Sequence, residues 1–145
     1  MPEIDQKSGQ ELDRAAKARS RIDRIRRLLQ KLRGKRYRDA FVQTHTRQFL
    51  AQQMRAFRGE RSQDEMGALL DKPQSVISRL EDASYGKWTL STLFEISAKL
   101  DKALIVRFVD PQTFVKFSVD AGDVSQNPIS FSDEALIAAD SDMLK

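Results

Sequence analysis

Pro73 separates two short segments that both carry the apolar spacing of a helix. A proline pushes the residue before it out of the helical conformation, and it suits the first position of a new helix. Upstream, Ser62 is followed three residues later by Glu65, which is the pattern of a capping box that starts a helix. The sequence therefore predicts one helix from Ser62 to the turn at Lys72, and a second from Pro73 to about residue 82.

The apolar side chains of these two helices are placed to pack on each other. Met66 and Leu70 face the core from the first helix, and Ile77 and Leu80 face back from the second. Gly67 provides a small residue where the second helix approaches most closely. These residue types match the requirements of two helices that cross at roughly 90 to 120°.

The net charge of +4 hides an uneven distribution along the chain. Residues 1–58 carry 16 basic and 6 acidic side chains, which gives +10. Residues 59–100 carry 5 against 7, or −2, and residues 101–145 carry 4 against 8, or −4. Within residues 14–38, twelve Lys or Arg accompany a single acid, Asp23. This asymmetry indicates a polyanion partner for the basic end, and nucleic acid is the first candidate.

The composition excludes most metal and thiol chemistry. The chain contains no Cys and a single His, so it has no thiolate nucleophile or Cys-ligated zinc, and too few histidines for a metal cage. His45 has polar neighbours, and no Ser, Cys or carboxylate pair near it in the sequence completes a catalytic constellation. We therefore expect a solvated or partly packed His45, no metal, no cofactor and no enzymatic activity. A small nuclease that uses His45 and scattered acids is the remaining enzyme alternative.

The sequence also argues against a membrane location. No stretch approaches the roughly 20 apolar residues that cross a bilayer. The first ten residues lack the apolar core of a secretory signal. These observations predict a cytoplasmic protein without a membrane partner.

The remaining pattern divides the chain into three parts. Residues 1–40 are expected to form a basic helical extension, with one apolar seam over residues 15–32. Residues 41–103 contain the two short helices, a preceding helix that runs to about Arg58 and stops at Gly59, and a following helix over residues 89–100.

Period-two alternation then predicts a strand over residues 104–109, and a second β-rich run covers residues 114–119. Because Asp110-Pro111 is a turn signal, residues 104–145 are expected to form a short β-hairpin followed by an acidic tail. Ser132 is positioned to cap a short helix in that tail.

The segment of the two short helices resembles the helix-turn-helix of the lambda-repressor-like (XRE, Cro) family. Residues 63–80 read QDEMGALLDKPQSVISRL, while QQMRAFR resembles the family's first helix and TLSTLFEISAKLDKAL its closing helices. The turn departs from the family pattern, because Asp71 stands where Gly is usual and Lys72 where an apolar residue is usual. Asp can adopt the left-handed conformation at modest cost, so Asp71 is tolerable there.

The resemblance covers about residues 47–104 and implies the fold class. It is mainly α: a lambda-repressor-like helical DNA-binding domain with a basic N-terminal helical extension and a short C-terminal β-hairpin.

The resemblance also implies that residues 73–80 lie in the major groove of double-stranded DNA. The side chains expected to contact bases are those that point away from the apolar positions: Gln74, Ser75, Ser78 and Arg79. Gln can bond adenine and Arg can bond guanine, each through two atoms. Phosphate contacts are expected from Gln63, Lys72, Tyr85 and Lys87. For Glu81 the resemblance suggests a structural ion pair with Arg55 or Arg58.

The expected function is a sequence-specific transcriptional repressor that binds a palindromic operator as a homodimer, because one short helix reads only a few base pairs. The alternative is an antitoxin that regulates its own gene through the same domain and neutralises a toxin protein through an extension. Four roles stay open for the basic N-terminal helix: a DNA contact, a dimerising seam, a surface for a protein partner, or a solvated helix.

Overall fold

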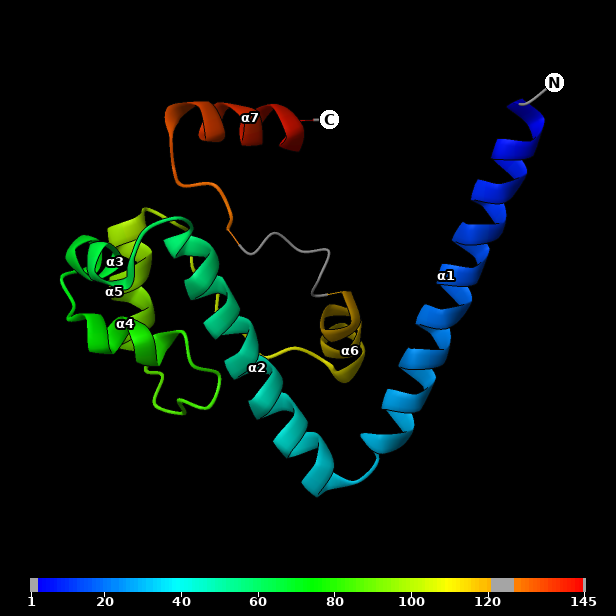
Figure 1. The fold of residues 1–145 in the computed structure, drawn as a ribbon, viewed down its shortest axis with the longest axis horizontal. Helices are drawn as coiled ribbons and strands as arrows, with labels where there is room; N and C mark the ends of the chain where they lie inside the picture. The colour runs from blue at the N-terminus through cyan, green and yellow to red at the C-terminus, as the bar shows by residue number, and fades with distance from the viewer. Residues whose placement is uncertain (1–2, 121–126, 145) are drawn as a thin grey trace. The chain divides into compact units, whose positions relative to one another are not determined.

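The computed structural model describes residues 3–120 and 127–144, and in these ranges the chain forms helices and no strand. The helices are α1 (Glu3–Lys31), α2 (Lys35–Arg58), α3 (Gln63–Leu70), α4 (Gln74–Leu80), α5 (Leu90–Leu100), α6 (Pro111–Asp120) and α7 (Asp133–Met143) (Figure 1). Backbone contacts divide the described chain into two units. The first contains residues 3–42 and 109–120, and the second contains residues 43–108 and 127–144.

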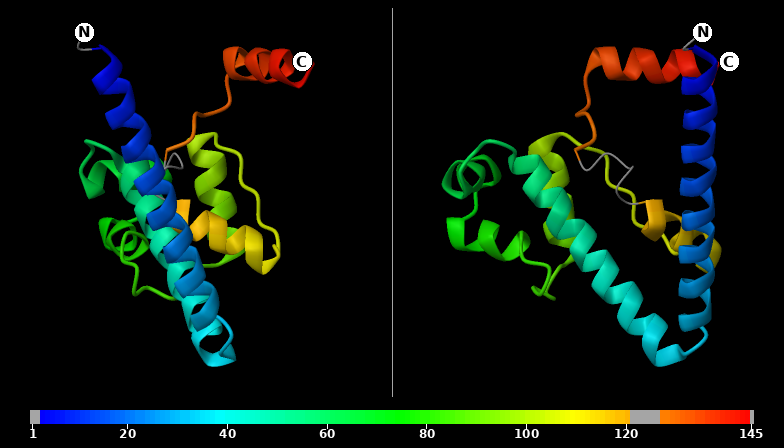
Figure 2. Two further views of the ribbon diagram at one scale, coloured as in Figure 1. Left: turned by 90° about the vertical axis from the view of Figure 1, so that its right-hand side faces the viewer. Right: turned by 45° about the vertical axis from the view of Figure 1, so that its right-hand side comes forward.

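The first unit is built on the packing of α6 against α1 (Figure 2). Arg21 of α1 forms an ion pair with Asp120 at the end of α6, with 2.7 Å between Arg21 Nε and Asp120 Oδ1. Val115 of α6 is buried, with 2% of its surface exposed. The ring of Phe114 meets the ring of Phe41 edge-on, with centroids 6.1 Å apart. An ion pair, a buried valine and an aromatic contact therefore contribute to the packing of this unit.

The second unit has a larger apolar core, to which four helices contribute. Its buried cluster consists of Met54, Met66, Leu70, Ile77, Leu80 and Ile96. Met66 and Leu70 come from α3, and Ile77 and Leu80 come from α4, as predicted from the sequence. The two short helices thus pack on each other through the expected side chains, with α5 and the end of α2 completing the core.

Several helix ends follow from the capping residues in the sequence. Ser62 Oγ accepts a hydrogen bond from the Glu65 backbone N–H at 3.1 Å, and the Glu65 carboxylate accepts one from the Ser62 N–H at 2.6 Å. This confirms the predicted capping box. Thr89 caps α5 and Ser132 caps α7 through the side-chain hydroxyl alone, which accepts a hydrogen bond from the N–H of Thr92 and of Ala135, respectively. Gly59, with φ of 56°, follows the last residue of α2.

The predicted β-hairpin is wrong. Residues 104–109 have no regular secondary structure, and residues 111–120 form α6. The Asp110 carboxylate accepts hydrogen bonds from the Thr113 N–H at 2.9 Å and from Thr113 Oγ1 at 2.8 Å. Pro111 then occupies the first helical position, where its fixed φ is favourable. The Asp-Pro pair therefore starts a helix, and residues 104–109 lose the strand expected to pair with them.

Candidate nucleic-acid interface

The turn between α3 and α4 begins with Asp71 in the left-handed conformation, at φ 52° and ψ 44°. The following N–H, that of Lys72, donates to the Gly67 carbonyl at 2.8 Å and closes the end of α3. The Asp71 carboxylate forms an ion pair with Lys99 of α5. The hydrogen bond from Lys99, together with its positive charge, lowers the pKa of Asp71. An aspartate therefore supplies the conformation for which the family pattern uses glycine.

Gly67 is required where α3 meets the turn. A Cβ atom at this position would lie 2.4 Å from the Lys72 carbonyl oxygen and 3.5 Å from the Gln74 nitrogen. Both are backbone atoms, so they could not move aside without displacing the start of α4. The glycine thus permits the close approach of the two helices that the sequence predicts.

The four residues predicted to contact bases lie on the exposed side of α4. These are Gln74, Ser75, Ser78 and Arg79. Ile77 and Leu80, on the other side of the same helix, are buried in the core. The polar side chains are therefore carried by a helix whose orientation is fixed by its apolar residues.

Gln74 is held by a chain of side-chain hydrogen bonds. Its Nε2 donates to Gln63 Oε1 at 2.6 Å, and Gln63 Nε2 donates to Glu81 Oε2 at 3.0 Å. Gln63 thus positions Gln74. The Gln63 amide nitrogen carries a second N–H, which can donate to a phosphate. This link between the start of α3 and the start of α4 was not predicted from the sequence.

Glu81, at the end of α4, anchors this helix to α2. Arg58 Nε donates to Glu81 Oε1 at 2.6 Å, and Arg55 Nη2 donates to the Glu81 carbonyl at 2.6 Å. The expected structural ion pair is therefore present with Arg58, and Arg55 adds a backbone contact. Glu81 is 5% exposed. Burial by itself would raise the pKa of Glu81, but hydrogen bonds from Arg58 and Gln63 lower it below its usual value.

The other predicted phosphate contacts differ in how available they are. Lys72 has a side chain that is 17% exposed, and its Nζ lies 2.7 Å from a carboxylate oxygen of Glu95 on α5. Tyr85 is half-buried against the core cluster. Lys87 is exposed and forms no ion pair with any residue in the described part of the chain. Of the two lysines, Lys87 is therefore the one with an uncommitted charge.

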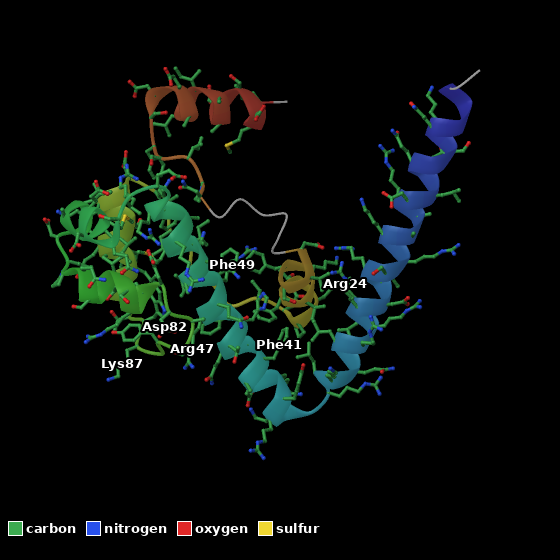
Figure 3. The ribbon with its side chains drawn as sticks, in the orientation of Figure 1. Arg24, Phe41, Arg47, Phe49, Asp82 and Lys87 are labelled. Carbon is green, nitrogen blue, oxygen red and sulfur yellow. The ribbon has the colours of Figure 1, made fainter. Side chains whose placement is uncertain are left out.

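Arg47 adds a second cation beside the loop that follows α4. It extends from α2 toward this loop, which also carries Asp82 and Lys87 (Figure 3). A Cβ atom on Gly86 would lie 3.2 Å from Arg47 Cζ, so the guanidinium packs directly on the loop backbone. Arg47 was not predicted as a site residue, because only the folded chain brings it near residue 86. The absence of a side chain at Gly86 is the one sequence signal of this contact.

Within residues 3–120 and 127–144, no three His, Asp or Glu side chains are grouped so that they could hold a metal ion. In the same ranges, no helix combines the length and the apolar character needed to cross a membrane.

Comparison with known proteins does not assign the chain to a family. No protein-family model matches it, and neither the curated proteins nor the solved structures contain a significant match. The resemblance to lambda-repressor-like proteins therefore rests on the residues of the sequence alone.

Proposed function

We propose that this chain is a sequence-specific, double-stranded DNA-binding transcriptional repressor, and not an enzyme. It acts in the cytoplasm as a homodimer on a palindromic operator, with α3 and α4 as its helix-turn-helix and α4 in the major groove. The observation that best supports the proposal is the division of α4, with Ile77 and Leu80 buried and four polar side chains exposed. A helix divided in this way presents its polar side to base edges while its other side sets the orientation.

Gln74 and Arg79 are the two side chains with the strongest base-reading chemistry. Arg79 can donate two hydrogen bonds to guanine O6 and N7, and Gln74 can bond adenine N6 and N7. The hydrogen bond from Gln74 to Gln63 restricts the rotamers of Gln74 before DNA arrives. Less side-chain entropy is then lost on binding, so the contact gains affinity.

The decisive experiment is a binding titration with the DNA upstream of the chain's own gene. It is run at several salt concentrations and compared with random-sequence duplex. We expect at least about a thousandfold preference for a palindromic site, since this is the lower end of what specific DNA-binding proteins achieve. Equal affinity for all duplexes would contradict the proposal.

Substitution of Arg79 tests where the reading surface lies. Arg79→Ala should lose about 1–3 kcal/mol of discrimination at one base pair and leave the other positions unchanged. Lys87→Gln is the matched control, because loss of a phosphate contact weakens binding to all sequences alike. Competition against a set of single-base operator variants measures both effects. If Arg79→Ala kept the full sequence preference, the reading surface would have to lie elsewhere.

The homodimer is supported by an apolar surface in the second unit. Leu90 and Phe94 are one helical turn apart on α5, and they are 50% and 57% exposed. Exposed apolar side chains grouped in this way are typical of an association surface. Sedimentation equilibrium should give a dimer for the wild-type chain and a monomer for Phe94→Glu, which places a charge on this surface. A wild-type monomer at operator-saturating concentrations would contradict the dimer.

A further inference from the structure

α1 carries a density of positive charge that its acidic residues do not neutralise. Residues 14–31 contain eight Lys or Arg and one acid, Asp23, which leaves a net +7. At a rise of 1.5 Å per residue this segment is about 27 Å long, so it carries one net charge about every 4 Å. Duplex DNA carries one negative charge about every 1.7 Å of its axis. The positive charge on α1 is thus within about threefold of the charge density of a duplex.

Several of these cations are not engaged by the protein itself. Arg19, Arg27 and Lys31 are exposed and form no ion pair with any residue of the described ranges. Arg19 and Arg27 line the same shallow hollow along α1, together with Ala15, Ala16 and the acidic Asp23. Arg19 and Arg27 therefore share one side of the helix, and Lys31 follows Arg27 by about one helical turn.

By contrast, a cation of α1 is neutralised by the protein itself where α6 packs on α1. Arg21 is bound to Asp120, and Ile25 and Leu28, which follow Arg21 at helical spacing, are half-buried. Val115 of α6 is buried in the same unit. A helix of the same chain thus packs on α1 beside Arg21, whereas Ile22 and Leu29 of the apolar seam stay 45% exposed. The cations that α6 does not engage remain available to another partner.

We propose that the side of α1 carrying Arg19, Arg27 and Lys31 binds the phosphate backbone of double-stranded DNA without reading its sequence. This contact goes beyond the proposed function, because it involves neither α3 nor α4 and supplies affinity without specificity. Each cation seated on a phosphate releases a condensed counterion, so log affinity falls with log salt by about 0.9 per contact. Arg is well suited to the role, since its planar fork can donate two hydrogen bonds to one phosphate.

The test compares the full wild-type chain with the triple variant Arg19→Gln, Arg27→Gln, Lys31→Gln. The probe is a short random-sequence duplex, titrated between about 50 and 200 mM salt. We expect the salt slope to fall by about 2 to 3, and the affinity at the lowest salt to fall at least about tenfold. Gln has nearly the helix propensity of Arg and Lys, so the circular dichroism spectrum should not change.

Two further variants keep the result interpretable. The control Arg107→Gln, Lys116→Gln removes two exposed positive charges outside α1, α3 and α4, and its slope should change by less than about 1. The charge-retaining variant Arg19→Lys, Arg27→Lys, Lys31→Arg should keep the wild-type slope. An unchanged slope for the α1 triple variant would overturn the proposal, and so would an equal loss in the control variant.

The random-sequence probe also separates this proposal from the proposed function. Absence of any operator preference, with the α1 slope change still present, would contradict the repressor and support the α1 contact. Preference for the operator, with no change of salt slope in the α1 triple variant, would support the repressor and contradict the α1 contact.

Discussion

The helix pair α3–α4 and the helix pair α1–α6 are held together in different ways. Between α3 and α4 lie four buried apolar side chains, Met66, Leu70, Ile77 and Leu80, and the hydrogen bonds of Glu81 tie the end of α4 to α2. Between α1 and α6 runs the ion pair of Arg21 with Asp120, and Val115 of α6 is buried. The first pair therefore shares a packed apolar core, whereas the second includes an ion pair between partly exposed side chains.

This difference fits the tasks proposed for the two regions. Reading a base edge needs donors and acceptors held to within about half an ångström, which requires a packed supporting shell. Neutralising phosphates requires charge near the backbone and tolerates a looser arrangement. Under the proposed function and the proposed α1 contact, specificity belongs to α3 and α4 and nonspecific affinity belongs to α1, and each part can be tested separately.

The largest effect is expected from Ile77→Ala. Ile77 is completely buried at the centre of the second unit. Removing three carbon atoms leaves a cavity, so the free energy of unfolding of this unit should fall by about 3 to 4 kcal/mol. Urea denaturation followed by circular dichroism measures the change. Ser78→Ala, on the exposed side of the same helix, is the control and should change little.

A smaller loss is expected from Glu81→Gln. This change keeps the shape but removes the negative charge opposite Arg58, and it replaces one of the two oxygens that accept from Arg58 and Gln63 with an NH2 donor. Stability should fall by about 2 kcal/mol, because the partners of a buried carboxylate are left poorly matched. Thermal unfolding measures the change. A midpoint equal to that of the wild type would show that this network does not hold α4 in place.

Acid should destabilise the second unit in two stages. Burial lowers the pKa of His45, so its contribution to stability is present above the unfolded pKa near 6.5 and is lost as the pH falls below it. The pKa of Glu81 is also lower in the folded state, so its contribution is lost as the pH falls below about 4.3. Unfolding free energies measured from pH 7 to 3 should show both losses. Glu81→Gln should reduce the second loss and leave the first unchanged.

The smallest effect of the set is expected in the first unit, from Val115→Ala. Losing two methyl groups at this buried position should cost about 1 to 2 kcal/mol. The effect should be confined to the first unit, to which this residue belongs. Hydrogen exchange should then become faster in α6 and stay unchanged in α4, whereas the exposed control Lys116→Ala should alter neither. Faster exchange in α4 would show that the two pairs are not independent.

The two pairs also differ in how far the sequence predicts them. For α3 and α4, the Ser62–Glu65 capping box, Gly67 and Pro73 all indicate the same arrangement within a few residues of each other. For α6, Asp110-Pro111 is compatible with either a turn or a helix start, and the β-branched residues favoured the wrong choice. The packing of α6 on α1 joins residues 99 positions apart, a contact that no local pattern encodes.

The candidate site shows the same limit. The exposed residues of α4 follow from helical periodicity, and the role of Glu81 followed from the family resemblance. The Gln63–Gln74 hydrogen bond and the contact of Arg47 with Gly86 depend on side-chain geometry in three dimensions. Neither contact can be derived from the spacing of residues along the chain. Gln63 and Gln74 belong to different helices, and Arg47 of α2 is 39 residues away from Gly86 in the sequence.

The turn between α3 and α4 is joined to α5 by two ion pairs, Asp71 with Lys99 and Lys72 with Glu95. Glu95 and Lys99 are four positions apart, so the two ion pairs connect the turn to the same side of α5. If a second copy of the chain packed on Leu90 and Phe94 of α5, these two ion pairs would couple the dimer contact to the start of α4. The distance between the two reading helices of a dimer would then respond to ionic strength, since exposed ion pairs weaken as salt increases.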